Sequence, residues 1–183
     1  MQAIPQQSDK EARTNRCFEA LLWALSRPGQ VRDLPEVGEA QIIEALLDRE
    51  CCAHLAPGLA NDEIVSAKFI ATRAERVEID RADHVFVGHL DDCASLSCLK
   101  TGSDLYPDDG ATLVVRADIG FGQRVRLSGP GVDGSLEIGT GRLPLDFWSQ
   151  RARLVRYPMG FEIFLLDGNR VIGIPRSTKV EIV

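Results

Sequence analysis

Residues 111–128 read ATLVVRADIGFGQRVRLS, and the character of the chain changes across this stretch. Ala111–Ala117 is a run of apolar and β-branched residues, which is typical of a buried strand. Gln123–Ser128 alternates apolar residues with arginines, so we expect a strand with one buried and one solvated face. Residues 118–122 between them are predicted to form a turn.

Before this stretch, helical patterns alternate with short strand patterns. Ser8 and Glu11 form the S-x-x-E capping signature of a helix that continues to Leu25 and is ended by Pro28-Gly29. Further helices are expected over residues 40–48 and 91–99, and another from a cap at Asn61 or Asp62 through Ile70. Strands are expected over residues 51–56 and 85–88.

After this stretch, hairpin patterns dominate. We expect a strand at 135–139, a helix over 145–155, a hairpin of 161–166 with 170–174, and a last strand piece around Val180 and Ile182 after Pro175. Helices interleaved with strands, followed by hairpins, predict an α/β fold with a mixed β-sheet covered by helices. No repeat or linker divides the chain, so residues 1–183 are expected to form a single domain.

The composition indicates an ordinary folded protein: of 183 residues, 44% are hydrophobic and 26% are charged. The longest apolar run, residues 20–25, is far too short to cross a membrane, and the start MQAIPQQSDK lacks a signal-peptide pattern. Five cysteines without a framework-like spacing favour reduced thiols. These features predict a soluble cytoplasmic protein.

The net charge of −6 is unevenly distributed. Residues 1–115 carry 11 Lys and Arg against 20 Asp and Glu, whereas residues 116–183 carry 10 against 7. Because nonspecific nucleic-acid binding depends on neutralising many phosphates, this balance argues against a nucleic-acid partner. A local basic face for a small anion or an acidic partner stays open.

Residues 129–134 (GPGVDG) match the dinucleotide fingerprint G-x-G-x-x-G, but they precede a strand pattern instead of a helix. Pro130 also removes one of the amides that would bind a pyrophosphate. We therefore expect a tight structural turn.

Four metal-ligating residue types lie close in sequence, namely His84, His89, Cys93 and Cys98. The two histidines would face opposite sides of a strand, and the two cysteines would be about 140° apart on a helix. Since zinc needs convergent ligands, we expect no metal site here.

Two further patterns resemble catalytic motifs. Residues 97–100 spell S-x-x-K without the companion motifs of acylating enzymes, and the pairs Asp91-Asp92 and Asp108-Asp109 lie where caps and turns are expected. No catalytic residue and no cofactor is predicted.

Residues 174–179 (IPRSTK) are the more informative segment. Pro175 stops a strand and leaves Arg176, Ser177 and Thr178 on an irregular stretch, and arginine beside hydroxyl groups suits an oxyanion or a phosphate. A strand-edge bend with exposed polar groups is the alternative. Ser128 could join the same pocket if the fold brings the two segments together. We take Ser128, Arg176, Ser177 and Thr178 as candidate ligand-binding residues.

Four segments that span nearly the whole chain in order resemble the PhnH family, a subunit of the bacterial carbon–phosphorus lyase complex. They are Phe18–Gly29 (FEALLWALSRPG), Thr101–Val115 (TGSDLYPDDGATLVV), Leu127–Val132 (LSGPGV) and Pro158–Glu181 (PMGFEIFLLDGNRVIGIPRSTKVE). Glu162 stands where the family has aspartate, and Ser177 where it has threonine, and both exchanges keep the chemical type.

The resemblance implies a cytoplasmic homodimer that assembles with sibling subunits, with a reduced version of the pyridoxal-phosphate-dependent transferase fold that lacks the cofactor. It also implies an accessory role in phosphonate breakdown, in which the ribose triphosphate of ATP is transferred to an alkylphosphonate and adenine is displaced. A nucleotide or phosphonate ligand is compatible with this role. A stand-alone enzyme acting on a phosphorylated small molecule and a purely structural assembly subunit are the alternatives.

Overall fold

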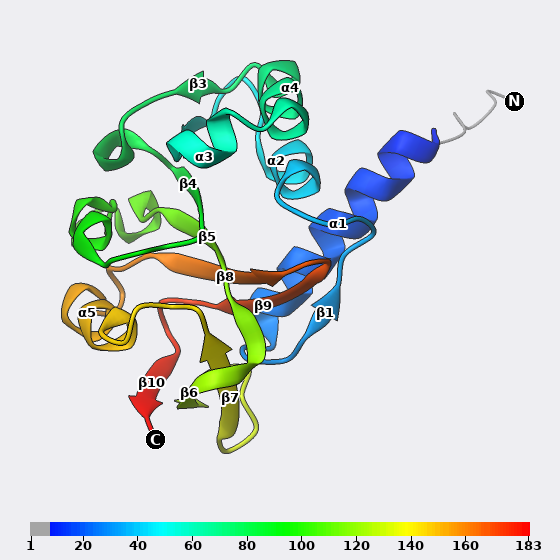
Figure 1. Ribbon diagram of the computed structural model, residues 1–183. Helices are drawn as coiled ribbons and strands as arrows, with labels where there is room; N and C mark the ends of the chain where they lie inside the picture. Colours follow the sequence, from blue (N-terminus) through cyan, green and yellow to red (C-terminus); the bar gives the residue numbers. More distant parts are fainter. Residues whose placement is uncertain (1–7) are drawn as a thin grey trace, which may run out of the picture.

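A seven-stranded mixed sheet forms the centre of the computed structural model, which describes residues 8–183 (Figure 1). The strand order is β1-β9-β8-β5-β4-β2-β3. Strands β3, β2, β4, β5 and β8 run parallel; β9 pairs antiparallel with β8, and β1 pairs antiparallel with β9. The strands are β1 (Arg32–Asp33), β2 (Cys52–Leu55), β3 (Glu75–Arg76), β4 (His84–Gly88), β5 (Thr112–Arg116), β8 (Glu162–Asp167) and β9 (Arg170–Ile174). The predicted mixed sheet is confirmed.

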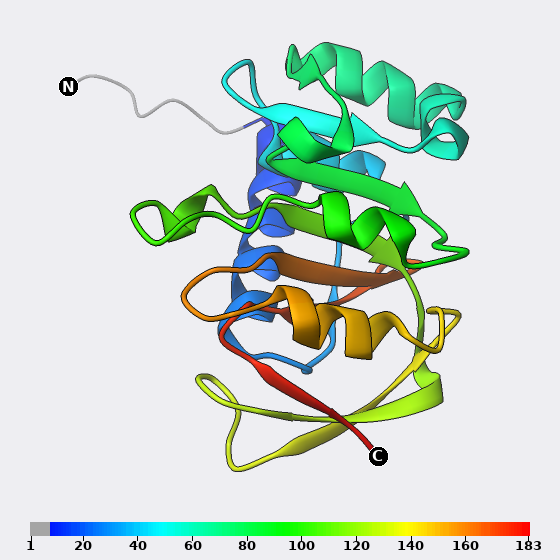
Figure 2. The same ribbon diagram turned by 90° about the vertical axis from the view of Figure 1, so that its left-hand side faces the viewer.

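Helices cover both faces of this sheet (Figures 1 and 2). One face carries α1 (Asp9–Ser26), α2 (Ala40–Leu46), α3 (Pro57–Ala60) and α4 (Glu63–Thr72). The other face carries α5 (Phe147–Leu154) and the 3₁₀ helices η1 (Ile79–Arg81) and η2 (Ala94–Cys98). A third 3₁₀ helix, η3 (Pro107–Asp109), lies in the loop before β5.

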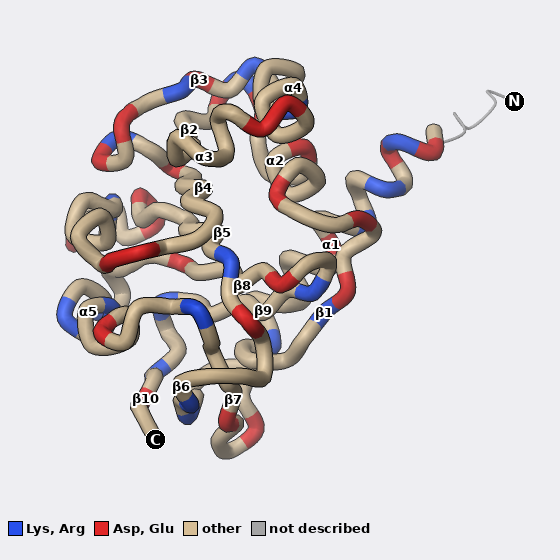
Figure 3. Tube along the Cα trace, in the orientation of Figure 1, with Lys and Arg blue, Asp and Glu red and all other residues tan. Residues whose placement is uncertain are grey.

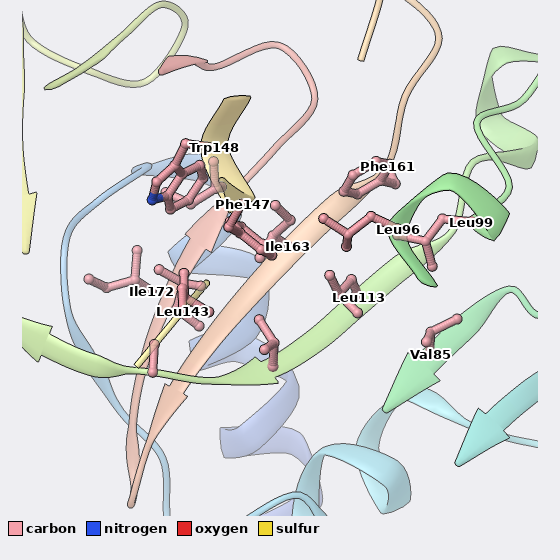
Figure 4. Close-up of a cluster of buried hydrophobic side chains, with 14 of the residues drawn as sticks. Val85, Leu96, Leu99, Leu113, Leu143, Phe147, Trp148, Phe161, Ile163 and Ile172 are labelled. Atoms are coloured by element: carbon pink, nitrogen blue, oxygen red, sulfur yellow. The ribbon is translucent and has the colours of Figure 1, made fainter. Parts of the chain in front are cut away.

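Side chains that alternate along the strands build a separate core on each face. Val114 and Phe164 pack with α1 and α2, whereas Leu113 and Ile163 pack on the opposite side with α5 and η2. Figure 4 shows Phe147 next to Trp148, and Phe161 near Leu96, over the second of these faces. Because both faces are covered, the central strands read as nearly continuous apolar runs.

A second sheet packs against the α5 face. It has the antiparallel order β10-β6-β7, formed by β6 (Asp118–Ser128), β7 (Leu136–Gly141) and β10 (Lys179–Ile182). Val125 and Leu127 are fully buried while Arg124 and Arg126 face solvent, which confirms the predicted two-faced strand.

The prediction of a turn over residues 118–122 is wrong, because these residues belong to β6. The register of β6 with β7 shifts between Ile119 and Arg124, and both Gly120 and Gly122 have positive φ. A Cβ on Gly122 would lie 2.6 Å from the Cα of Gly141. The glycines therefore form an irregularity that lets β6 and β7 approach closely, and the chain passes here from β5 in the large sheet to β6 in the small one.

Most helix boundaries agree with the patterns. The capping box of Ser8 and Glu11 is present, and Asp62, not Asn61, caps α4. Where an α-helix was expected over residues 91–99, only Ala94–Cys98 is helical, as the 3₁₀ helix η2, and α3 was not predicted. The start of the chain, with its lack of a signal-peptide pattern, lies partly outside the described residues. Within residues 8–183, no helix has the length and apolar character needed to span a membrane.

Candidate functional site

Arg176, a candidate anion-binding residue, is engaged with other parts of the protein. Its Nε donates to Glu162 Oε1 at 2.5 Å, and its main-chain N–H donates to Glu162 Oε2 at 2.6 Å. A third hydrogen bond runs from its Nη1 to the carbonyl of Pro107. The side chains of the pair are only 14% and 18% exposed. Within residues 8–183, Nη2 has no hydrogen-bond partner, so an anion could contact this nitrogen but would have to replace Glu162 to bind through Nε.

The pairing of β6 with β10 brings Ser128 level with Lys179, next to the predicted segment. Thr178 is 2% exposed, and its Oγ1 has no hydrogen-bond partner within residues 8–183. Ser128 and the segment thus lie together, although no hydrogen bond in this part of the chain joins Ser128 to Arg176.

The segment of residues 174–179 is held in place by the buried side chain of Arg151, which belongs to no motif in the sequence. Arg151 is 3% exposed and donates from Nη1 to the carbonyl of Thr178 at 3.2 Å and from Nη2 to the carbonyl of Pro175 at 2.9 Å. Burial lowers the pKa of Arg151 to about 10, so the guanidinium stays charged at neutral pH. These two hydrogen bonds stabilise the bend at residues 175–178 without a bound ligand.

A cleft of about 380 Å³ lies elsewhere, at the carboxyl ends of the parallel strands. Arg116 ends β5, Asp167 ends β8, and His89 directly follows β4. The full lining is Val37, Gly38, His89, Arg116, Ala117, Asp118, Arg142, Leu166, Asp167 and Gly168. Figure 3 shows charged residues of both signs where β5 leads towards β6. In open α/β sheets, this edge is where ligands bind.

Arg116 is oriented by a buried carboxylate. Glu39, only 1% exposed, accepts from Arg116 Nε at 2.6 Å and from Nη2 at 2.7 Å. This bidentate pair raises the pKa of Arg116 above its ordinary value. Nη1 has no hydrogen-bond partner within residues 8–183, so one edge of the guanidinium remains available at the cleft.

Arg142, which also lines the cleft, directly follows β7 and has an unusual backbone conformation. Its φ is 64°, in the left-handed region that residues with a Cβ rarely occupy, and such strain gathers at functional sites. Its Nε donates to Asp118 Oδ2 at 3.0 Å, and the pair is exposed to solvent. The remaining guanidinium nitrogens can therefore turn towards a ligand.

Main-chain atoms of Gly38 and Gly168 also line the cleft. Gly38 donates from its amide to the carbonyl of Gly168 at 3.0 Å, which joins the loop before α2 to the β8–β9 turn. A Cβ on either glycine would meet no atom within 4 Å. Asp167 accepts from the amide of Ile119 at 3.2 Å and also from Arg170, so its charge is balanced.

Residues 129–134 form the predicted turn, with the amide of Val132 donating to the carbonyl of Gly129 at 3.1 Å, and they lead into β7. A Cβ on Gly131 would lie 2.4 Å from the carbonyl oxygen of Ser26, so this turn packs against the end of α1. Within residues 8–183, His, Cys, Asp and Glu side chains form no group of three that could hold a metal.

Fold and cleft together define an α/β protein with a mixed central sheet and a polar cleft at the carboxyl ends of its parallel strands. The family model described as "Bacterial phosphonate metabolism protein (PhnH)" matches residues 5–181. The chain therefore belongs to the PhnH family, as the four sequence segments predicted.

Two curated relatives cover most of the chain. The "Putative C-P lyase subunit protein HtxG" of Stutzerimonas stutzeri is 27% identical over 176 residues, which is 93% of this chain and 87% of the relative. The "Alpha-D-ribose 1-methylphosphonate 5-triphosphate synthase subunit PhnH" of Rhizobium meliloti (strain 1021) is 27% identical over 180 residues, which is 90% of this chain and 88% of the relative.

The cleft was missed because its residues are scattered over the sequence and none belongs to a motif. A signal was nevertheless present. His89, Arg116 and Asp167 each end or directly follow a strand that was predicted correctly. Parallel pairing of those strands places the three residues on one edge.

Proposed function

We propose that this protein is an accessory subunit of a carbon–phosphorus lyase complex. In this role it supports the transfer of the ribose triphosphate of ATP to an alkylphosphonate, with displacement of adenine. The observation that carries the proposal is the PhnH family match over residues 5–181. Both curated relatives are named as subunits, and one is a subunit of a synthase that makes a ribose methylphosphonate triphosphate.

The role of a subunit implies contacts with sibling subunits and, by the family resemblance, with a second copy of the chain in the cytoplasm. The same resemblance makes the α/β scaffold a reduced form of the pyridoxal-phosphate-dependent transferase fold used without its cofactor. The whole of residues 1–183 would act as one domain, since both faces of the central sheet share the same strands.

The proposal allows two roles, anion binding or structural support, for the candidate residues Ser128, Arg176, Ser177 and Thr178. As anion ligands they would bind through Nη2 of Arg176, or through Nε if a phosphate replaced Glu162. As structural residues they would hold β10 and the loop before β5 in place.

Reconstitution tests the proposal. Release of adenine from ATP in the presence of methylphosphonate is measured with the sibling subunits alone, with this protein alone, and with all of them together. The proposal predicts adenine release only from the complete mixture. Release by this protein alone would establish a stand-alone enzyme, and undiminished release by the siblings without it would remove it from the reaction.

A further inference from the structure

The cleft at the carboxyl ends of β4, β5 and β8 combines two arginines with groups that accept hydrogen bonds. Arg116 ends β5 and Arg142 directly follows β7, and both line the cleft. Guanidinium groups bind phosphate and phosphonate oxygens through paired, charge-assisted hydrogen bonds. Asp118 and Asp167, which also line the cleft, are acceptors for the hydroxyl groups of a ligand.

The charges of the cleft bear on how the anion would bind. Arg116 is neutralised by Glu39 and Arg142 by Asp118, while Asp167 is paired with Arg170. Attraction at long range is therefore weak, and recognition must come from direct hydrogen bonds. The exposed pair of Arg142 and Asp118 costs little to open, because solvent-exposed ion pairs contribute only about 0–1 kcal/mol.

The size and lining of the cleft limit what it can hold. A volume of about 380 Å³ lies near the lower end of the range for small-molecule sites. His89 is the only aromatic side chain among the lining residues, and the two arginines and two aspartates make the lining mainly polar. Gly38 and Gly168 leave the main chain open to close approach by a ligand.

We infer that this cleft binds a small phosphate or phosphonate anion that carries hydroxyl groups, and that the anionic group, not a nucleobase, is what the cleft recognises. Arg142 and the free edge of Arg116 contact the anion, and Asp118 or Asp167 accepts from the hydroxyl groups. Ligand binding is tested on the isolated chain, whereas the proposed function is tested with the sibling subunits. Either result can therefore be negative while the other is positive.

The test is a calorimetric titration of the isolated protein with ribose 5-phosphate, inorganic phosphate and adenosine. Arg142→Gly is the main variant, since it removes the guanidinium and relieves the left-handed backbone strain. Arg73→Gly is the matched control, because Arg73 is also exposed, has a φ of 63°, and ends α4 away from the cleft. Circular dichroism establishes that each variant is folded; Arg142→Asn or Arg73→Asn, in which asparagine tolerates the same conformation, replaces the glycine variant at its position if that variant is not folded.

We expect ribose 5-phosphate to bind more tightly than inorganic phosphate, and adenosine not to bind. Arg142→Gly should weaken ribose 5-phosphate binding about tenfold or more, the loss expected for a charge-assisted hydrogen bond, and Arg73→Gly should leave it unchanged. Absence of ribose 5-phosphate binding, equal weakening by both variants, or binding of adenosine with comparable affinity would overturn the inference.

Discussion

The carboxylate of Glu39, buried at the start of α2, is paired at both oxygens with the guanidinium of Arg116 at the end of β5. The two residues are 77 positions apart, and their contact ties a helix on one face of the sheet to the edge at which the cleft opens. Loss of one partner leaves the other without its counter-charge.

Arg116→Ala is expected to lower the free energy of unfolding by about 2 kcal/mol, less than for a fully buried pair because the arginine is partly exposed. The measurement is a urea unfolding curve. Arg124→Ala, which breaks an exposed pair with Glu137, is the control and should change stability by less than about 1 kcal/mol. Adding Glu39→Gln to Arg116→Ala should restore part of the loss, and no restoration would contradict a charge effect.

A close approach of two main-chain segments near the other end of the parallel strands predicts a steric effect at Gly110. Its φ is −71°, which any residue can adopt, but a Cβ would lie 2.0 Å from the carbonyl oxygen of Gly160. Gly110→Ala should destabilise the protein by about 3 kcal/mol. Gly58→Ala in α3, where a Cβ meets nothing within 4 Å, should be neutral or slightly stabilising. Equal unfolding midpoints for the two variants would refute this explanation.

His84 makes the stability depend on pH. Burial lowers the pKa of His84 below 6.5, and the neighbouring Asp83, which is paired with Lys100, only partly opposes this. The unfolded chain therefore binds a proton at His84 more readily than the native protein does. Stability should fall as the pH drops below about 6.5 and should not change through this group above that value.

Urea midpoints at pH 7.5 and pH 5.5 measure this effect. The part due to His84 is expected to be about 1 kcal/mol and to disappear in His84→Gln. His89→Gln, which alters an exposed histidine at the cleft, should retain it. A His84→Gln variant with the same pH dependence as the original protein would assign the effect to other groups.

Arg176→Ala separates the structural and ligand-binding roles of Arg176. Because the buried pair with Glu162 and the contact with Pro107 are lost together, the free energy of unfolding should fall by about 3 kcal/mol. Hydrogen exchange should become faster in the loop of residues 101–110. Titration with ATP then decides the second role, since unchanged binding by this variant would exclude Arg176 as a ligand of the nucleotide.

Local patterns were sufficient to predict much of the fold. The capping box at Ser8, the β8–β9 hairpin and the alternation in β6 depend on neighbours in sequence, and each is present in the structure. The α/β class with a mixed sheet followed from these elements alone.

What the sequence could not show depends on distant contacts. The role of Gly122 becomes visible only beside Gly141, and the division into two sheets follows from that approach. The pairing of Arg176 with Glu162 could not be predicted either. The sequence around Arg176 would look the same whether its guanidinium binds an anion or a carboxylate of the protein.

The central claim is that this chain acts as a subunit of a carbon–phosphorus lyase complex. The most direct measurement is purification of the tagged protein from cells that grow on methylphosphonate as the sole source of phosphorus, with identification of the proteins that accompany it. The account predicts recovery of the sibling lyase subunits in fixed proportion to this chain. Recovery of the protein without them, from cells that make all of the subunits, would contradict it.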